Sequence, residues 1–447
     1  MKTPICDFVK SYIDSGTARL HMPGHKGISV LGAEPFDITE IGGADVLYSS
    51  QGIIRESEAN AEALFNTART VYSAEGSSLS IRAMLFLAMR HALESGKRPL
   101  IAAGRNAHKV FVNTAALLDF DIVWIYSKNS ESIISCEITA DTLEKDLAEM
   151  NEKPTAVYIT SPDYLGNIAD IEGISAVCRR HGILLLVDNA HGAYLQFLPK
   201  SQHPISIGAD MCADSAHKTL PVLTGGGYLH ISKNAPALLC EQSEQAMAMF
   251  ASTSPSYLIL QSLDAANRYL FEGYRKRLCT FTKRLAGFKQ KLEDYGYTLV
   301  GNEPMKLSLA PKSLGYTGYE LANILRGEGI ECEFANLDYV VLMPTPELNA
   351  NILAHIETLL LSVTPRAAIK QKPPCAGAAL RAMTPREVML MPTEEIAAST
   401  AVGRILASAD IACPPAIPIA VCGEVIDETA VAALEYYGIK VCRVVKE

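Results

Sequence analysis

A single lysine stands where the neighbouring residues would suit a reactive amine. Lys218 closely follows Ser215 and His217 and precedes the apolar, glycine-rich run TLPVLTGGG at 219–227. In a confined, weakly polar pocket a lysine amine has a lowered pKa and can form a Schiff base with an aldehyde. Ser215 and His217 could donate hydrogen bonds to an anion beside it. The alternative is an ordinary solvated surface lysine, and this segment alone leaves both interpretations open.

The second candidate is a carboxylate at the end of an apolar run. Residues 183–187 read Ile-Leu-Leu-Leu-Val and predict a buried strand, which Asp188 follows directly. A buried carboxylate there could hold a proton on the ring nitrogen of pyridoxal phosphate, since the protonated ring is what draws in electrons. Ala190 and His191 would then lie under the flat ring and at its edge. The alternative for Asp188 is a helix cap or a turn former.

A pair of serines opens a strong helical pattern and could bind an anion. Gly76, Ser77 and Ser78 stand at the start of a helix predicted over 77–95. The first N–H groups of a helix lack partners within the helix, and the helix dipole favours negative charge there. Simple capping by the serines is the alternative. The anion interpretation gains weight because a phosphate-bearing cofactor is already suspected.

Histidines provide two further candidates of different kinds. His108 lies in AGRNAHKV, after a strand-like run, and could stack on the cofactor ring opposite Ala190. The alternative for His108 is a loop histidine with satisfied hydrogen bonds. His21 and His25 in HMPGH are separated by proline and glycine and have no carboxylate beside them, so we predict no metal site.

The elements that must position these residues follow from the pattern of hydrophobicity. Between about residues 70 and 235, short apolar runs alternate with helical patterns, which predicts a mainly parallel sheet with helices on both faces. Ligands of such sheets bind beyond the carboxyl ends of the strands. The runs expected as strands are 98–104, 120–127, 154–160, 182–188 and 225–231, and the expected helices are 77–95 and 171–182.

The pattern changes after about residue 240. A long, charged helical stretch covers about 256–296, and strand-like runs at 305–310 and 339–344 bracket a helix at 318–327. These features predict a small α+β domain, followed by a linker at 370–375 and a compact C-terminal appendage. The predicted division is an N-terminal segment at 1–70 that contributes to a dimer and its active site, a large domain at 71–296, the small domain at 297–369 and a C-terminal domain at 370–447.

Composition excludes several classes of function. The net charge of -9 disfavours nucleic acid and anionic membranes as partners, because either requires a basic face. No run of 18 apolar residues occurs, and the N-terminus lacks the pattern of a secretory signal. The 11 cysteines are scattered without a CxxC pair, which favours reduced thiols in the cytoplasm.

The order of several motifs resembles that of a known family. These motifs are similar to those of the fold-type-I pyridoxal-phosphate decarboxylases of ornithine, lysine and arginine, and the resemblance covers nearly the whole chain. It is strongest to the short bacterial form, which lacks an N-terminal wing domain. It implies an α/β fold like that of aspartate aminotransferase. The motifs are HMPGHKG, GRNAHK, SPDYLGN, VDNAHGAY, SAHKTLPVLT, STSPSY, GIECEFA and CPPAIP.

The resemblance also implies roles for individual residues. Lys218 resembles the Schiff-base lysine, Asp188 the partner of the ring nitrogen, and His108 the stacking histidine. With His217 they form the expected catalytic set. Ser254 lies in STSPSY, which resembles a loop that reaches the phosphate of a neighbouring subunit; this implies a homodimer with shared active sites, with larger assemblies left open. The expected cofactor-binding residues are Ser77, Ser78, His108, Asp188, Ala190, His191, Ser215, His217, Lys218 and Ser254.

Seven positions depart from the motifs of the family, and at three of them Ala107, Val110 and Cys413 replace a cysteine, a serine and a tyrosine. Asn189 replaces an acidic residue, and Gly225 replaces a glutamine. Ala416 and Cys422 replace a glycine and a proline in two C-terminal motifs. The cofactor-binding positions are retained, so these departures put the substrate, and the activity itself, in doubt more than the cofactor.

The expected activity is decarboxylation of arginine, lysine or ornithine, with Lys218 or His217 protonating the substrate carbon. Glu333 and Asp45 are candidates for contacting the cationic end of such a substrate. One alternative is another fold-type-I reaction, either transamination or carbon–sulfur lysis. An aminotransferase would need an arginine clamp, for which Arg366 is the candidate, although we expect it at the surface. A non-catalytic paralogue that binds the cofactor is the other alternative.

Overall fold

The computed structural model describes residues 1–127, 132–374, 377–408, 412–413 and 417–447. The chain forms two compact units. The first comprises residues 1–99, 155–157 and 171–279, and the second comprises residues 100–154, 158–170 and 280–447. Within the described ranges, no helix has both the length and the apolar character that crossing a membrane requires.

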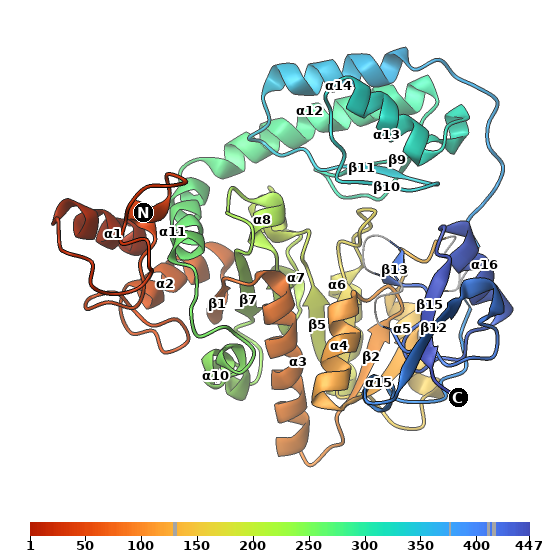
Figure 1. Ribbon diagram of the computed structural model, residues 1–447, viewed down its shortest axis with the longest axis horizontal. Helices are drawn as coiled ribbons and strands as arrows, with labels where there is room; N and C mark the ends of the chain where they lie inside the picture. The colour runs from red at the N-terminus through yellow and green to blue at the C-terminus, as the bar shows by residue number, and fades with distance from the viewer. Residues whose placement is uncertain (128–131, 375–376, 409–411, 414–416) are drawn as a thin grey trace. The chain divides into compact units, whose positions relative to one another are not determined.

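Seven strands form a mainly parallel sheet in the order β1-β7-β6-β5-β4-β2-β3 (Figure 1). Strand β5 runs parallel to β6, and β2 runs parallel to β3, whereas β7 is antiparallel to both β1 and β6. This α/β architecture confirms the fold class expected from the sequence. The strands are β1 Arg69–Ser73, β2 Leu100–Gly104, β3 Asp121–Ile125, β4 Ala156–Thr160, β5 Leu184–Asp188, β6 Met211–Asp214 and β7 Gly227–Ile231.

All five runs expected as strands of this sheet are strands, but the pattern missed β1 and β6. Strand β1 reads Arg-Thr-Val-Tyr-Ser and is buried throughout. Its polar residues break the apolar run by which a buried strand is predicted. The Arg69 guanidinium is compensated by Glu58 at 2.7 Å, Glu62 at 2.9 Å and Glu244 at 2.6 Å. Paired in this way, a charged residue can occupy an almost fully buried strand. Strand β6 has only four residues, too few to show a period.

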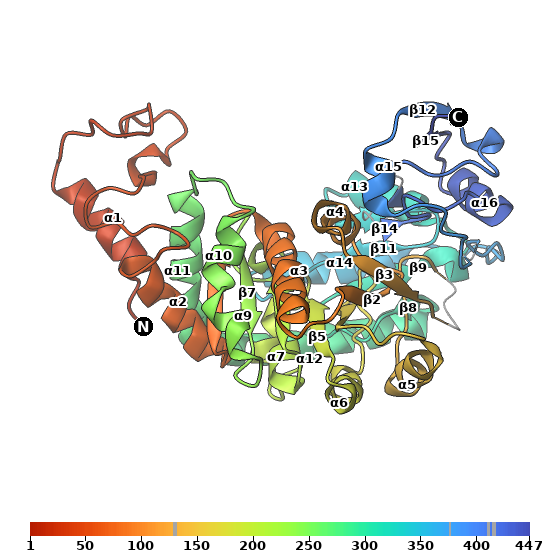
Figure 2. The same ribbon diagram turned by 90° about the horizontal axis from the view of Figure 1, so that it is seen from below.

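A buried carboxylate joins three helices of the first unit. Asp264 of α11 accepts the backbone N–H groups of Ile5 and Cys6 at the start of α1, both at 3.0 Å. Its other oxygen accepts the Ser57 hydroxyl of α2 at 2.6 Å. Figure 2 shows these three helices side by side. The helices of the unit are α1 Pro4–Asp14, α2 Ile53–Phe65, α3 Gly76–Glu94, α6 Ile171–His181, α7 Pro204–Ile207, α8 Ala216–Thr219, α9 Ala237–Glu241, α10 Ser243–Ala248 and α11 Tyr257–Phe271.

The helical stretch expected over 256–296 consists of two helices. Helix α11 ends at Phe271, and α12 spans Tyr274–Tyr295. Gly273 between them has a φ of +80°, a left-handed conformation that stops a helix and that glycine adopts without steric cost. The sequence predicts one continuous helix because the charged, periodic pattern is the same on both sides of this single glycine.

The second unit contains a four-stranded antiparallel sheet in the order β10-β11-β9-β8. Helix α13 spans Gly318–Gly327, as predicted, because Thr317 and Glu320 form a reciprocal capping box at its start. The sheet and its helices enclose one apolar core. The remaining elements of this part are α4 Lys109–Leu118, α5 Ala140–Glu149, α14 Ala350–Ser362, β8 Thr298–Val300, β9 Leu307–Ala310, β10 Phe334–Ala335 and β11 Val340–Leu342.

The C-terminal segment of the second unit packs around a two-stranded sheet of β12 and β15. Arg105, which follows β2, donates to the carbonyl oxygens of Pro418 at 2.9 Å and Ile419 at 3.0 Å. Its guanidinium also lies 3.4 Å from the buried Glu424 carboxylate. The elements here are α15 Pro385–Met389, β12 Thr393–Ala397, β13 Ala412–Cys413, β14 Ile417–Pro418, α16 Glu428–Tyr436 and β15 Val441–Val445.

Candidate active site

Two adjacent parallel strands bring the principal candidates to one edge of the sheet. Asp188 is the last residue of β5, and its Cα pairs with that of Ala213 in β6. Strand β6 ends one residue later, and the short helix α8 that follows carries Lys218. Because the carboxyl ends of parallel neighbours lie at the same edge, the sequence order places a carboxylate and an amine together.

The turn after β5 connects these two groups. Its His191 lies with Nε2 3.3 Å from the Nζ of Lys218, close enough for the amine to donate a hydrogen bond. Asp188 is buried, and its Oδ1 accepts the N–H of Ala190 at 3.2 Å. The turn closes with a bond from the N–H of Gly192 to the carbonyl of Asn189 at 2.8 Å. A short, fixed loop thus holds the candidate carboxylate and the imidazole.

The start of helix α3 forms the candidate anion site. Ser215 Oγ donates to Ser77 Oγ at 2.8 Å, so two buried hydroxyls meet at the helix N-terminus. Ser78 lies in the same first turn. A Cβ added to Gly227 would lie 2.8 Å from the carbonyl oxygen of Asp214 and 3.0 Å from the carbonyl carbon of Gly76, so a glycine is required for this close backbone approach. Hydroxyls and unpaired helical N–H groups make such a site suited to phosphate.

His217 is held in one tautomer by the backbone. Its Nδ1 lies 2.9 Å from the carbonyl oxygen of Gly226, which can only accept, so Nδ1 carries the proton. Burial lowers the pKa of His217 below its ordinary value, and the charge of Lys218 acts in the same direction against the Gly226 bond. At neutral pH His217 is therefore a neutral imidazole whose Nε2 accepts hydrogen bonds.

Two expected site residues lie elsewhere in the chain. Ser254 is exposed in the loop before α11; its N–H is bonded to the Ser252 hydroxyl at 3.1 Å, and the Ser252 N–H is bonded to Glu75 at 2.7 Å. This loop therefore lies beside the start of α3. His108 belongs to the second unit, where its Nδ1 accepts the N–H of Val110 at 3.2 Å and caps α4. Its stacking role stays a prediction.

Asp45 and Arg366, the candidates for contacting substrate groups, have structural roles elsewhere. The Asp45 carboxylate accepts backbone N–H groups of Gly52 at 2.8 Å and Ile54 at 3.1 Å, which caps helix α2. Arg366 is exposed, lies 4.0 Å above the Tyr316 ring and pairs with a surface carboxylate. The first observation argues against Asp45 as a substrate contact, and the second supports the expectation that Arg366 lies at the surface.

Glu333 keeps its candidacy for the cationic end of a substrate. It is exposed, and one carboxylate oxygen accepts the Tyr164 hydroxyl at 3.0 Å. Tyr164 belongs to the SPDYLGN segment, so two motifs of the sequence meet in the second unit. Among the residues that the structure describes, none donates to the other carboxylate oxygen, which is available to a further donor.

Four of the departures from the family motifs illustrate different structural settings. Gly225 has a φ of +99°, and a Cβ there would lie 2.9 Å from the carbonyl oxygen of Ala74, so the backbone requires glycine. Asn189 is completely buried beneath the turn, and Cys422 is also buried. Ala416 lies outside the described residues.

One substitution tests the tightness of the turn. A Cβ at Gly192 would lie 2.0 Å from Asn189 Oδ1 and 2.8 Å from Leu195 Cδ1. We expect Gly192→Ala to lower the free energy of unfolding by about 1–3 kcal/mol through overpacking, measured by urea denaturation. Gly287→Ala is the control, because nothing lies within 4 Å of its added Cβ. In helix α12 that change should be neutral or stabilising; equal losses in both variants would refute the tight turn.

Sequence reasoning missed the buried cluster behind this site. The cluster consists of His203, Asp214 and His230. These residues are too far apart in the sequence to form a short motif that would predict their contact. The one available signal is the position of Asp214, an acidic residue at the end of a strand directly before Ser215.

Comparisons with known proteins identify the family and the fold. A family model described as "Orn/Lys/Arg decarboxylase, major domain" matches residues 3–299. An arginine decarboxylase of Halalkalibacterium halodurans is 29% identical, over 96% of this chain and 92% of the relative. An arginine decarboxylase of Bacillus subtilis is 28% identical over the same shares. The constitutive lysine decarboxylase of E. coli superimposes with a TM-score of 0.78 at 16% identity, covering 100% of this chain and 82% of that structure, and so has the same fold.

Proposed function

Since this chain belongs to the Orn/Lys/Arg decarboxylase family, we propose that it is a pyridoxal-phosphate-dependent decarboxylase of a basic amino acid, releasing carbon dioxide and the corresponding amine. The observation that carries the proposal is the arrangement at the carboxyl ends of β5 and β6, where Lys218 lies 3.3 Å from His191 in the turn after Asp188. An amine, an imidazole and a buried carboxylate at one sheet edge suit this chemistry.

The donor set of the first unit fits pyridoxal phosphate. Lys218 supplies an amine for the aldehyde, and the buried Asp188 supplies a negative charge for a protonated ring nitrogen. The Ser77 hydroxyl, which accepts from Ser215, and the N–H groups that follow Gly76 in the first turn of α3 supply donors for a phosphate. The N–H of Gly76 itself is bonded to Gly225. The aldehyde, the ring nitrogen and the phosphate of the cofactor therefore each have a partner of matching chemistry, which supports its assignment.

Pyridoxal phosphate, when bound, supplies an electron-accepting ring that takes up the electron pair left when carbon dioxide departs. Asp188 would keep the ring nitrogen protonated, and burial away from water strengthens that charge interaction. Lys218, in its ammonium form, would return a proton to the substrate carbon and would be left as a neutral amine. His217 suits this role less well, because its lowered pKa leaves it neutral and Gly226 already accepts from its Nδ1–H.

Arginine is the first substrate to test. Two relatives that share most of their length with this chain are named arginine decarboxylases, at 29% and 28% identity. Glu333 offers an exposed carboxylate to a cationic group, and a guanidinium binds carboxylates with paired hydrogen bonds. The exposed position of Arg366 on the Tyr316 ring disfavours a role in clamping the substrate carboxylate of an aminotransferase.

The assembly and location are part of the same proposal. The exposed Ser254 loop, which is tied to Glu75 next to helix α3, would contact the phosphate held by a second copy of the chain. We therefore infer a homodimer with shared sites, acting in the cytoplasm on a small amino acid.

A single assay tests the activity. Purified protein supplied with pyridoxal phosphate should release labelled carbon dioxide from carboxyl-labelled arginine, and more slowly or not at all from lysine and ornithine. Transfer of the amino group to a keto acid is measured in parallel. Amino transfer without release of carbon dioxide would contradict the proposal and favour the aminotransferase alternative.

A further inference from the structure

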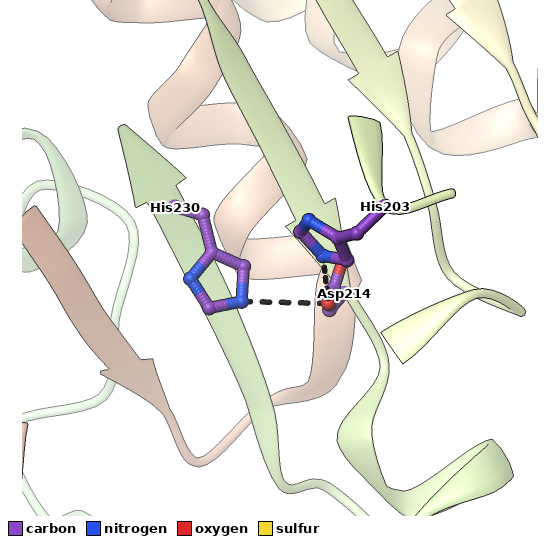
Figure 3. A group of neighbouring side chains, drawn as sticks. All are labelled: His203, Asp214 and His230. Atoms are coloured by element: carbon purple, nitrogen blue, oxygen red, sulfur yellow. Dashed lines mark hydrogen bonds and ion pairs between the residues drawn. The ribbon is translucent and has the colours of Figure 1, made fainter. Parts of the chain in front are cut away.

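A fully buried cluster lies directly behind the turn that carries the candidate site residues. Asp214 ends strand β6, His230 lies in β7, and His203 precedes helix α7. All three side chains are completely buried. Figure 3 shows both imidazoles pointing at one carboxylate oxygen, with Nε2 of His203 at 3.0 Å and Nε2 of His230 at 3.4 Å from Oδ2.

The protons of this cluster follow from its partners. Burial by itself would raise the pKa of the Asp214 carboxyl, but His203 and His230 outweigh it and hold that pKa well below its ordinary value. Burial also lowers the pKa of His230. Asp214 is therefore an anion that accepts N–H donors, and the Thr70 hydroxyl, 2.9 Å from the Nδ1 of His230, orients that ring from its far side.

The second oxygen of Asp214 connects the cluster to the candidate site. Asn189 Nδ2 donates to Asp214 Oδ1 at 2.7 Å, between two completely buried side chains. Asn189 directly follows Asp188, and its backbone N–H also donates to Ala213 at 3.0 Å. The Asn189 side chain also packs closely against Gly192, since a Cβ added there would lie 2.0 Å from Asn189 Oδ1. The turn is thus fastened to β6 by its backbone and by its side chain.

A metal ion is the competing explanation for two histidines around an aspartate. Ligands about 2.0 Å from a tetrahedral ion lie roughly 3.3 Å apart, which these distances would allow. A closed structural site has four ligands, however, and among the described residues three have ligand atoms that all lie within 4.8 Å of one another. The Cys212 thiol, 3.7 Å from Asp214 Oδ1, donates to that carboxylate, and burial holds the pKa of this thiol well above its ordinary value. Asn189 moreover turns an amide N–H toward the carboxylate, as hydrogen bonding to an anion requires. The geometry favours a hydrogen-bonded anion.

We propose that Asp214 is a positioning residue: held between His203 and His230, it binds Asn189 and so fixes the turn that presents Asp188 and His191. The importance of the turn rests on the proposed function, but the hydrogen-bond network does not. A hydrogen bond to a buried charge is among the stronger ones, so its loss should loosen the turn locally before it affects the rest of the unit.

The test removes the link and follows the turn in the full-length chain. In Asn189→Ala apoprotein, the backbone amides of residues 190–192 should exchange with deuterium at least about tenfold faster, as judged from one lost charged hydrogen bond. The loaded variant should lose kcat at nearly constant KM, and the pH midpoint of the cofactor absorption band should shift. Asn267→Ala is the matched control, since it removes a buried amide that donates to the Tyr72 hydroxyl at 2.7 Å.

The outcomes separate this proposal from its rivals. Equal acceleration at 190–192 in the Asn189→Ala and Asn267→Ala variants would mean general destabilisation and would overturn it, as would unchanged exchange in Asn189→Ala. If Asn189→Ala does not fold, Asp214→Asn keeps the volume and should accelerate the same amides less strongly. A stoichiometric metal that survives dialysis and is lost in His203→Ala would replace the proposal with a metal centre. Local acceleration without any decarboxylation would leave the positioning role intact and refute only the activity.

Discussion

Replacing the amine of Lys218 should abolish both cofactor attachment and turnover. In Lys218→Ala the absorption band of the lysine-bound cofactor is expected to disappear, and the decarboxylation rate should fall on the order of 10³-fold, since covalent attachment and proton return are lost together. The fold should survive, because Lys218 lies in α8, a helix of only four residues.

The matched control for this experiment is another lysine of the same unit. Lys200 is exposed on the surface, so Lys200→Ala should leave the band, the rate and thermal unfolding unchanged. Normal turnover in the Lys218→Ala protein would remove the basis of the proposed chemistry. A comparable loss in both variants would indicate a nonspecific effect of removing a cation.

The second large effect is expected at Asp188. Asn is nearly isosteric and keeps the oxygen that accepts the Ala190 N–H at 3.2 Å, so Asp188→Asn should fold and retain the cofactor. It cannot supply a negative charge to a protonated ring nitrogen, and the rate should fall about 10²-fold or more. Cofactor content from the absorption spectrum and kcat from released carbon dioxide measure the two properties separately.

A charge-conserving variant completes that experiment. Asp188→Glu keeps the charge but lengthens the side chain in a buried position, so its activity should lie between those of the wild type and Asp188→Asn. Full activity in Asp188→Asn would show that the carboxylate does not act on the ring nitrogen. Loss of cofactor in that variant would assign the residue to binding instead.

Strands and helices that carry a clear local signal in the sequence were predicted correctly. Strand β5 is an apolar run that ends in a polar residue, and α13 begins at a capping box, so both were predictable. Strand β1 was missed because Arg69 is paired with carboxylates from other elements. The division into four domains and the role of His108 stay predictions.

The candidate site also contains some features that local sequence predicts and others that depend on the folded chain. The order of the motifs predicts Lys218 and Asp188 as site residues, because each lies in a short segment whose residue types suit the chemistry. The bond between Asn189 and Asp214 joins residues 25 positions apart, and no periodicity of a strand or helix marks it. A side-chain pair that forms only when two strands align cannot be predicted from the sequence, and it is seen only in the folded structure.

The Asp264 carboxylate has a consequence for how the protein is made. It binds the first turn of α1 across a separation of 259 residues. During translation α1 therefore emerges long before Asp264 has been synthesised. Contacts between residues this distant along the chain form late. Helix α1 leaves the ribosome well before α11 and is among the last elements to reach its final position, so its apolar side remains uncovered in the interval.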